Sequence, residues 1–144
     1  MPVRLVLPFA TDQAHYEADA CVVWCFDDRF YRLLKAFGKH EHVSHIDLVK
    51  VAGGAKALAG GGSPERDFVL AQIRASIDMH KAKRVILMVH RDCGAYGGSQ
   101  AFANPQDESA HYESQLEAAK KFVMGEVQVP VGAYFADFDG LYAV

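Results

Sequence analysis

The distribution of apolar positions along the chain predicts a small set of buried strands. Residues 20–26 (ACVVWCF) and 84–90 (RVILMVH) are apolar runs rich in β-branched and aromatic side chains. Runs of this length are too short for helices and are typical of strands covered on both faces of a parallel sheet. Alternating apolar and polar residues predict another strand over residues 42–52, and a final strand fits residues 129–144.

Two segments between these strands have the apolar spacing of helices. The first covers residues 63–83, where we predict Ser63 as the N-cap and Pro64 as the first helical residue. The second covers residues 108–124, whose apolar side chains recur in helical register. Each predicted helix therefore lies between two predicted strands.

A further helix is predicted over residues 29–40, directly after the first strand. Its apolar side chains have helical spacing, and we expect Gly38 to end it. An aspartate before the helix can cap it, and Asp28 is a better candidate for this role than Asp27. The aromatic side chains of this segment are candidates for burial against a second copy of the chain: Phe30, Tyr31 and Phe37.

This alternation of strands and helices predicts an α/β fold for the whole chain. We expect one domain over residues 1–144, with a central, mostly parallel sheet and helices on both faces. In such sheets ligands bind beyond the carboxyl ends of the strands. Because Cys25 and His90 stand at two of these ends, we expect the segments around them to converge at one crevice.

Composition and charge exclude several classes of partner. The chain has 144 residues, of which 51% are hydrophobic and 23% charged, and its formal net charge is −3. This charge offers no attraction to nucleic acid or to an anionic membrane, and no apolar run is long enough to span a bilayer. We therefore predict a cytoplasmic protein, in which the three cysteines are free thiols, metal ligands or buried side chains.

The residues that follow the two apolar runs predict a metal site. His90 and Cys93 are close enough in the chain to reach one ion, and the fold would bring Cys25 to them. Two thiolates and one imidazole suit zinc, and three protein ligands with an open fourth position are typical of a catalytic site. Asp27 and Arg29 follow Cys25 closely, and an aspartate held by an arginine stays ionised and fixed in direction.

The two motifs together resemble the signature of the β-class carbonic anhydrases. They read Cys25-x-Asp27-x-Arg29 and His90-x-x-Cys93-Gly94. The resemblance covers most of residues 20–140, including DLVKVAGGA between the two motifs. It implies a β-carbonic-anhydrase-like fold and a zinc-dependent lyase that hydrates carbon dioxide reversibly to bicarbonate.

The resemblance also implies the roles of individual residues and the assembly. Cys25, His90 and Cys93 would bind one Zn²⁺ per chain, and Asp27 with Arg29 would form the catalytic dyad. Family members are dimers or larger assemblies, so the resemblance implies a homodimer or higher homo-oligomer. In some members the aspartate equivalent to Asp27 binds the zinc itself, and both states remain open at this point.

Some features depart from the family pattern and keep alternative functions open. The chain is short and lacks most of the helical N-terminal arm, KVAGG occupies residues 50–54, and Arg91 fills a position that is usually small and uncharged. One alternative is a hydrolase of carbon disulfide or carbonyl sulfide on the same scaffold. Another is a zinc-binding assembly protein without turnover.

Other residues that could carry chemistry have simpler interpretations. Cys21 lies within the first strand and is expected to pack in the core. The glycine-rich residues 53–62 lack the ending of a phosphate-binding loop, and we expect a turn or a wall of the pocket in which backbone approaches closely. For Asp92, a structural role within the turn that contains it is a simpler interpretation. Three histidines lead into the predicted strand over residues 42–52 and are expected to be solvated and not to bind a second metal: His40, His42 and His45.

Overall fold

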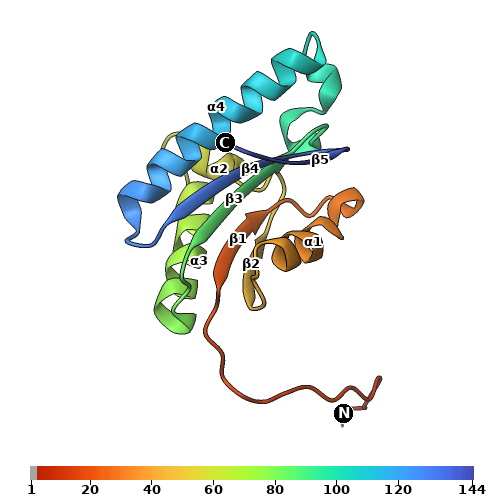
Figure 1. The fold of residues 1–144 in the computed structure, drawn as a ribbon, viewed down its shortest axis with the longest axis vertical. Coiled ribbons are helices and arrows are strands. Elements are labelled where there is room, and N and C mark those ends of the chain that lie inside the picture. The colour runs from red at the N-terminus through yellow and green to blue at the C-terminus, as the bar shows by residue number, and fades with distance from the viewer. Residues whose placement is uncertain (1–2) are drawn as a thin grey trace.

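The computed structural model describes residues 3–144, and its centre is a five-stranded β-sheet (Figure 1). The strand order across the sheet is β2-β1-β3-β4-β5. The first four strands run parallel, and β5 is antiparallel to β4. Their bounds are β1 (Ala20–Trp24), β2 (Ile46–Lys50), β3 (Val85–His90), β4 (Val131–Asp137) and β5 (Gly140–Ala143). The predicted α/β fold with a mostly parallel sheet is confirmed.

Helices cover both faces of the sheet, as predicted. Helix α1 (Leu33–His40) packs on one face, where Phe37 joins Trp24 in one apolar cluster. The opposite face carries α2 (Lys56–Ala59), α3 (Pro64–His80) and α4 (Pro105–Glu126). Ile73 and Leu116, from the two long helices, pack in the cluster on that face. Cys21 lies in the same cluster and is fully buried, in agreement with its predicted place in the core.

The two long helices begin at the same type of N-terminal signal. Ser63 caps α3, because its hydroxyl accepts a hydrogen bond from the backbone N–H of Arg66, and Pro64 follows as predicted. Helix α4 begins earlier than the predicted residue 108. Asn104 is its cap and accepts from the backbone N–H of Asp107, with Pro105 at the first helical position.

The segment predicted as one helix over residues 29–40 consists of a short 3₁₀ helix (Asp28–Phe30) and α1. Asp27, and not Asp28, caps the 3₁₀ helix, because its Oδ1 accepts from the backbone N–H of Arg29 at 3.0 Å. Helix α1 continues through Gly38 to His40. Glycine is needed there for close packing, since a Cβ at Gly38 would lie 2.8 Å from the carbonyl oxygen of Val43.

The aromatic residues of this segment were expected at a subunit interface, and for two of them the structure shows otherwise. Phe30 and Phe37 are 6% and 4% exposed, and both belong to the chain's own core. Tyr31 remains 54% exposed. The apolar spacing of the segment therefore marks an intramolecular contact.

Two predicted strands are shorter in the structure than in the sequence pattern. Residues 42–52 contain only β2, and His42 before the strand lies in a left-handed turn with φ 56°. Residues 129–144 form the hairpin β4–β5, which reverses between Asp137 and Gly140. Apolar and polar positions alternate through both arms of a hairpin, so the pattern alone does not show the reversal.

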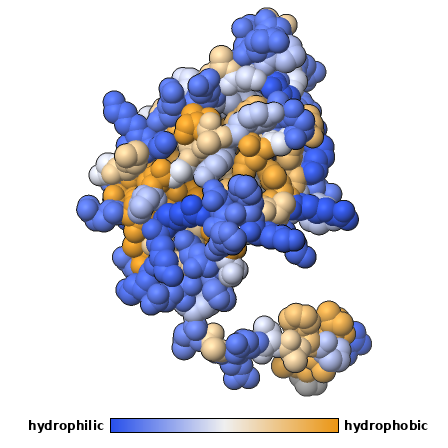
Figure 2. Space-filling model, viewed as in Figure 1, coloured by the Kyte–Doolittle hydropathy of each residue, from blue (hydrophilic) through white to orange (hydrophobic). Residues whose placement is uncertain are grey.

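Residues 3–17 form an extended arm that leaves the body of the molecule (Figure 1). Figure 2 shows hydrophobic side chains gathered at its far end. These side chains are at least 72% exposed: Val3, Leu5, Val6, Leu7 and Phe9. At the other end of the arm, the Tyr16 hydroxyl donates to Asp47 Oδ1 at 2.5 Å and ties the arm to β2. In residues 3–144, none of the helices combines the length and hydropathy needed to cross a membrane.

Candidate metal centre

Three potential metal ligands meet at the carboxyl ends of β1 and β3. Cys25 follows β1, His90 is the last residue of β3, and Cys93 lies in the loop after it. Their Sγ and imidazole nitrogen atoms lie within 4.8 Å of one another, and all three residues are buried. Within residues 3–144 no other cluster of histidine, cysteine or acidic side chains has this geometry. The fold therefore brings together the three residues predicted from the motifs.

The His90 ring is oriented so that one nitrogen remains available to an ion. Nδ1 lies 2.7 Å from the carbonyl oxygen of Arg91 and must donate to it, because a carbonyl only accepts. Nε2 is buried and has no hydrogen-bond partner. A buried polar atom without a partner is costly, and a metal ion beside the two thiols would remove this cost. The donor set thus fits zinc.

The two thiols interact closely. The pKa of Cys25 is lowered, chiefly because Cys93 donates a hydrogen bond to its thiolate. The same contact raises the pKa of Cys93, because a second negative charge would stand beside the first. Without a cation the pair therefore favours one thiolate and one thiol. A divalent cation would allow both to ionise.

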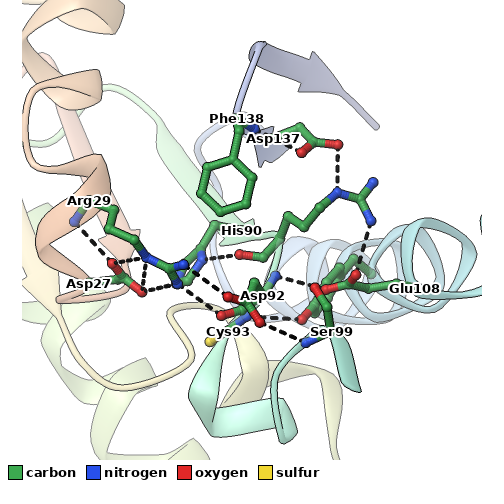
Figure 3. Close-up of polar contacts among 11 residues, drawn as sticks. Asp27, Arg29, His90, Asp92, Cys93, Ser99, Glu108, Asp137 and Phe138 are labelled. Atoms are coloured by element: carbon green, nitrogen blue, oxygen red, sulfur yellow. Dashed lines mark hydrogen bonds and ion pairs between the residues drawn. The ribbon is translucent and has the colours of Figure 1, made fainter. Parts of the chain in front are cut away.

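Asp27 and Arg29 form a two-pronged ion pair beside these ligands (Figure 3). Arg29 Nη2 donates to Asp27 Oδ2 at 2.7 Å, and Nε donates to Oδ1 at 3.0 Å. This contact lowers the pKa of Asp27 to about 2, so the carboxylate is ionised at neutral pH. Asp27 Oδ2 also lies 3.8 Å from His90 Nε2. The predicted dyad is thus assembled and faces the free ring nitrogen.

Arg29 has further partners that the sequence motifs did not identify. Its Nη1 donates to Asp92 Oδ2 at 2.9 Å, and its Nη2 donates to the Asp92 carbonyl oxygen at 3.0 Å. The Phe138 ring, at the turn of the β4–β5 hairpin, lies 5.3 Å from the guanidinium carbon. The position of Asp92 between His90 and Cys93 was a signal that it lies near the site.

Arg91, which departs from the family pattern, forms a largely buried polar network. Its Nε donates to Asp137 Oδ2 at 2.7 Å, and its Nη1 donates to Glu108 Oε2 at 3.0 Å. Its side chain is 15% exposed and that of Glu108 is 2% exposed. The other Glu108 oxygen accepts from the backbone N–H of Asp92 at 2.8 Å. The charge on Arg91 is therefore paired, and the network supports the loop that carries Cys93.

The glycine-rich segment forms a wall of the site, which was one of its two expected roles. Gly54 has φ +55°, and a Cβ there would overlap the carbonyl oxygen of Met88 and lie 3.1 Å from the backbone nitrogen of Cys25. Only glycine fits such a close approach at positive φ. The segment also contains the short helix α2, which the sequence pattern did not predict.

Solved structures that match this fold include carbonic anhydrases, among them members of the β class. The isoform I enzyme of Trichomonas vaginalis matches with a TM-score of 0.62 and 13% identity, over 94% of this chain and 87% of that chain. The carbonic anhydrase of Glaciozyma antarctica matches with a TM-score of 0.60 and 12% identity, over 90% and 83%. A structure from Sordaria macrospora, described as one of two tetrameric β-carbonic anhydrases, matches with a TM-score of 0.52 and 13% identity, over 90% and 81%.

Sequence comparison identifies the family. A search of curated proteins gave no match. A family model described as "Putative carbonic anhydrase" matches residues 16–142, which is most of the chain and includes both motifs. This match, together with the sheet order and the Cys25–His90–Cys93 cluster, shows that the chain belongs to the β-carbonic anhydrase family.

Proposed function

We propose that this chain catalyses the reversible hydration of carbon dioxide to bicarbonate with one zinc ion. Cys25, His90 and Cys93 would hold the ion. The observation that carries the proposal is the unpartnered Nε2 of His90, which lies 3.8 Å from an Asp27 oxygen, on a ring with a nitrogen within 4.8 Å of both thiol sulfurs. Membership of the carbonic anhydrase family supports this reaction.

A zinc ion held by Cys25, His90 and Cys93 would lower the pKa of a water molecule and so supply the nucleophile for carbon dioxide. The task of Asp27 is to accept a hydrogen bond from the attacking water at Oδ2 and so aim its lone pair at the carbon. Because the pKa of Asp27 is about 2, its carboxylate accepts throughout the neutral pH range. Arg29 donates to both carboxylate oxygens. It thereby keeps the Asp27 side chain from rotating toward the position that the metal would occupy.

The Asp27–Arg29 pair also bears on the alternative of a zinc-binding protein without turnover. A purely structural zinc site needs neither residue, whereas hydration needs an oriented acceptor. The ionised, doubly held carboxylate therefore favours an enzyme. The need for free thiols at Cys25 and Cys93 suits a reducing compartment, and we place the reaction in the cytoplasm.

We further propose that the chain acts as a homodimer or a larger homo-oligomer. The arm of residues 3–17 exposes a group of large apolar side chains that find no cover on their own chain. Exposed apolar groups of this kind mark association sites, and a second copy of the chain would cover them. The tetrameric Sordaria macrospora enzyme shows that this fold supports such assembly.

Stopped-flow measurement of carbon dioxide hydration, combined with metal analysis of the same sample, tests the proposed reaction. We expect about one zinc per chain and hydration that is lost when a chelator removes the metal. The proposal is wrong if the zinc-loaded protein does not accelerate hydration at any pH in the neutral range. Turnover of carbon disulfide or carbonyl sulfide by that same sample would then support the hydrolase alternative.

A further inference from the structure

The guanidinium of Arg29 is held on two sides by different carboxylates. Asp27 contacts its Nε and Nη2, and Asp92 Oδ2 accepts from its Nη1 at 2.9 Å (Figure 3). The Arg29 side chain is 45% exposed, so the protein core does not restrain it. Exposed ion pairs contribute modestly to stability, and a two-pronged pair is the more favourable case. The contact with Asp92 adds a second carboxylate that restrains the Arg29 guanidinium at Nη1.

Asp92 divides its two carboxylate oxygens between two tasks. Oδ1 accepts from the backbone N–H of Ser99 at 2.8 Å and closes the loop that carries Cys93. Oδ2 reaches Arg29. The loop is therefore tied by one oxygen, while the other is directed at the dyad. The contact with Ser99 and the contact with Arg29 can be separated by mutation. A side chain with a single acceptor oxygen can make only one of these two contacts.

The backbone of Asp92 is also held in a demanding conformation. Its φ is 56°, in the left-handed region that most residues avoid. Its N–H donates to Oε1 of Glu108 at 2.8 Å, and Glu108 is 1% exposed and paired with Arg91. A buried ion pair thus fixes the peptide from which the Asp92 side chain projects. Glu108 of α4 therefore holds the Asp92 backbone through a contact that does not involve Arg29.

From these contacts we propose that Asp92 is a positioning residue for the reaction. Asp92 Oδ2 holds Arg29, and Arg29 in turn fixes the direction in which Asp27 accepts a hydrogen bond. The effect on rate rests on the proposed function, whereas the effect on Arg29 itself does not.

The substitution that separates the two tasks is Asp92→Asn. Asparagine tolerates the left-handed conformation and keeps one oxygen that can serve Ser99, but its NH₂ group offers Arg29 no acceptor. We expect kcat/KM for carbon dioxide to fall about 10-fold, the scale on which residues that orient metal-site groups act. Zinc content and the thermal midpoint should stay at the parental values. Asp78→Asn, on the exposed side of α3, is the matched control.

Two readouts distinguish positioning from support of the loop. If Asp92 acts through Arg29, adding Asp92→Asn to an Arg29→Ala protein should cause no further loss of rate. Proton–nitrogen NMR provides the second readout, with the Arg29 side-chain N–H signals assigned by their absence in Arg29→Lys. We expect these protons to exchange faster with solvent in Asp92→Asn than in the parent. The NMR result requires no turnover.

Each outcome decides the proposal. Lower hydration with parental zinc content, faster Arg29 exchange and no additional loss in the double variant supports it. Parental hydration with unchanged Arg29 signals overturns it, and so does a loss of rate that follows a loss of zinc, because Asp92 would then only support the loop. If the zinc-loaded parent does not hydrate carbon dioxide, the proposed function fails, and the Arg29 signals alone decide whether Asp92 positions this side chain.

Discussion

Asp27 Oδ2 lies 3.8 Å from Nε2 of His90, too far for a hydrogen bond but close enough to face the same small volume. The imidazole has no partner at this nitrogen, and the carboxylate is turned toward it by Arg29. A gap therefore lies between His90 Nε2, a potential metal ligand, and Asp27 Oδ2, a potential hydrogen-bond acceptor. This gap is the place where metal and substrate chemistry would meet.

Cys93→Ser is expected to abolish stoichiometric zinc binding, because it replaces a soft anionic ligand by a neutral hydroxyl. Metal analysis of the purified variant measures this. Cys21→Ser is the control, since Cys21 is equally buried but pairs with Val85, at the opposite end of β3 from His90. It should keep zinc even if it loses stability. Full zinc occupancy in both Cys25→Ser and Cys93→Ser proteins would contradict the ligand assignment.

Asp27→Asn is expected to lower carbon dioxide hydration by about 100-fold or more while zinc content stays parental. Asparagine caps the 3₁₀ helix as well as aspartate does, but its amide loses the charge that binds Arg29 and the fixed acceptor at Oδ2. Stopped-flow hydration measures the effect. The exposed neighbouring residue supplies the control, Asp28→Asn, which should keep the parental rate. Near-parental hydration by a zinc-loaded Asp27→Asn protein would reject the assigned role.

Asp47 gives a pH-dependent contribution to stability. Burial raises its pKa, but hydrogen bonds from Ser76 and Tyr16 outweigh burial and leave the pKa below the ordinary value of 3.8. A carboxyl whose pKa is lower in the folded state stabilises the protein above pH 3.8, and this contribution disappears as pH falls through the folded-state pKa.

Urea denaturation at several pH values tests this prediction with Asp47→Asn. The variant should be less stable than the parent at neutral pH, and the difference in free energy of unfolding should shrink as the solution is acidified below the ordinary pKa of aspartate. A difference that grows on acidification would contradict the direction of the shift.

Arg91→Met is expected to lower the free energy of unfolding by about 3–5 kcal/mol, because it leaves Glu108 buried without its charged partner. Equilibrium urea denaturation at neutral pH measures the loss. Arg74→Met removes the exposed ion pair with Glu126, whose side chains are 50% and 37% exposed, and should cost less than about 1 kcal/mol. Equal losses in the two variants would show that the Arg91 network is not a special support of the fold.

Deletion of residues 3–13 is expected to shift the protein toward monomers, because it removes the exposed apolar side chains but keeps Tyr16 at the base of the arm. Light scattering at micromolar concentration measures the mass. Replacing Leu5, Leu7 and Phe9 by serine in the full chain should have the same effect, which separates apolar contact from chain length. A parent that is already monomeric would contradict the proposed assembly.

Local sequence signals were sufficient to predict the central strands and the start of α3. The apolar runs that became β1 and β3 are covered on both faces, so burial alone specifies them. Ser63 and Pro64 are a local signal that no distant contact needs to complete. The motifs around Cys25 and His90 also indicated which side chains would meet, because parallel strands place their carboxyl ends at one edge.

Only the tertiary structure decided what surrounds these side chains. Asp92 bonds to Arg29 and Glu108, which lie in segments far from it in sequence, and no local pattern encodes such a pairing. Gly38 looked like a helix end but is a point of close packing against Val43. The last predicted strand is a hairpin, and the sequence pattern did not reveal it because alternation has the same period before and after a reversal. Hydrophobic periodicity indicates which face of a helix or strand is buried. Which element packs against that face depends on the tertiary structure of the whole chain.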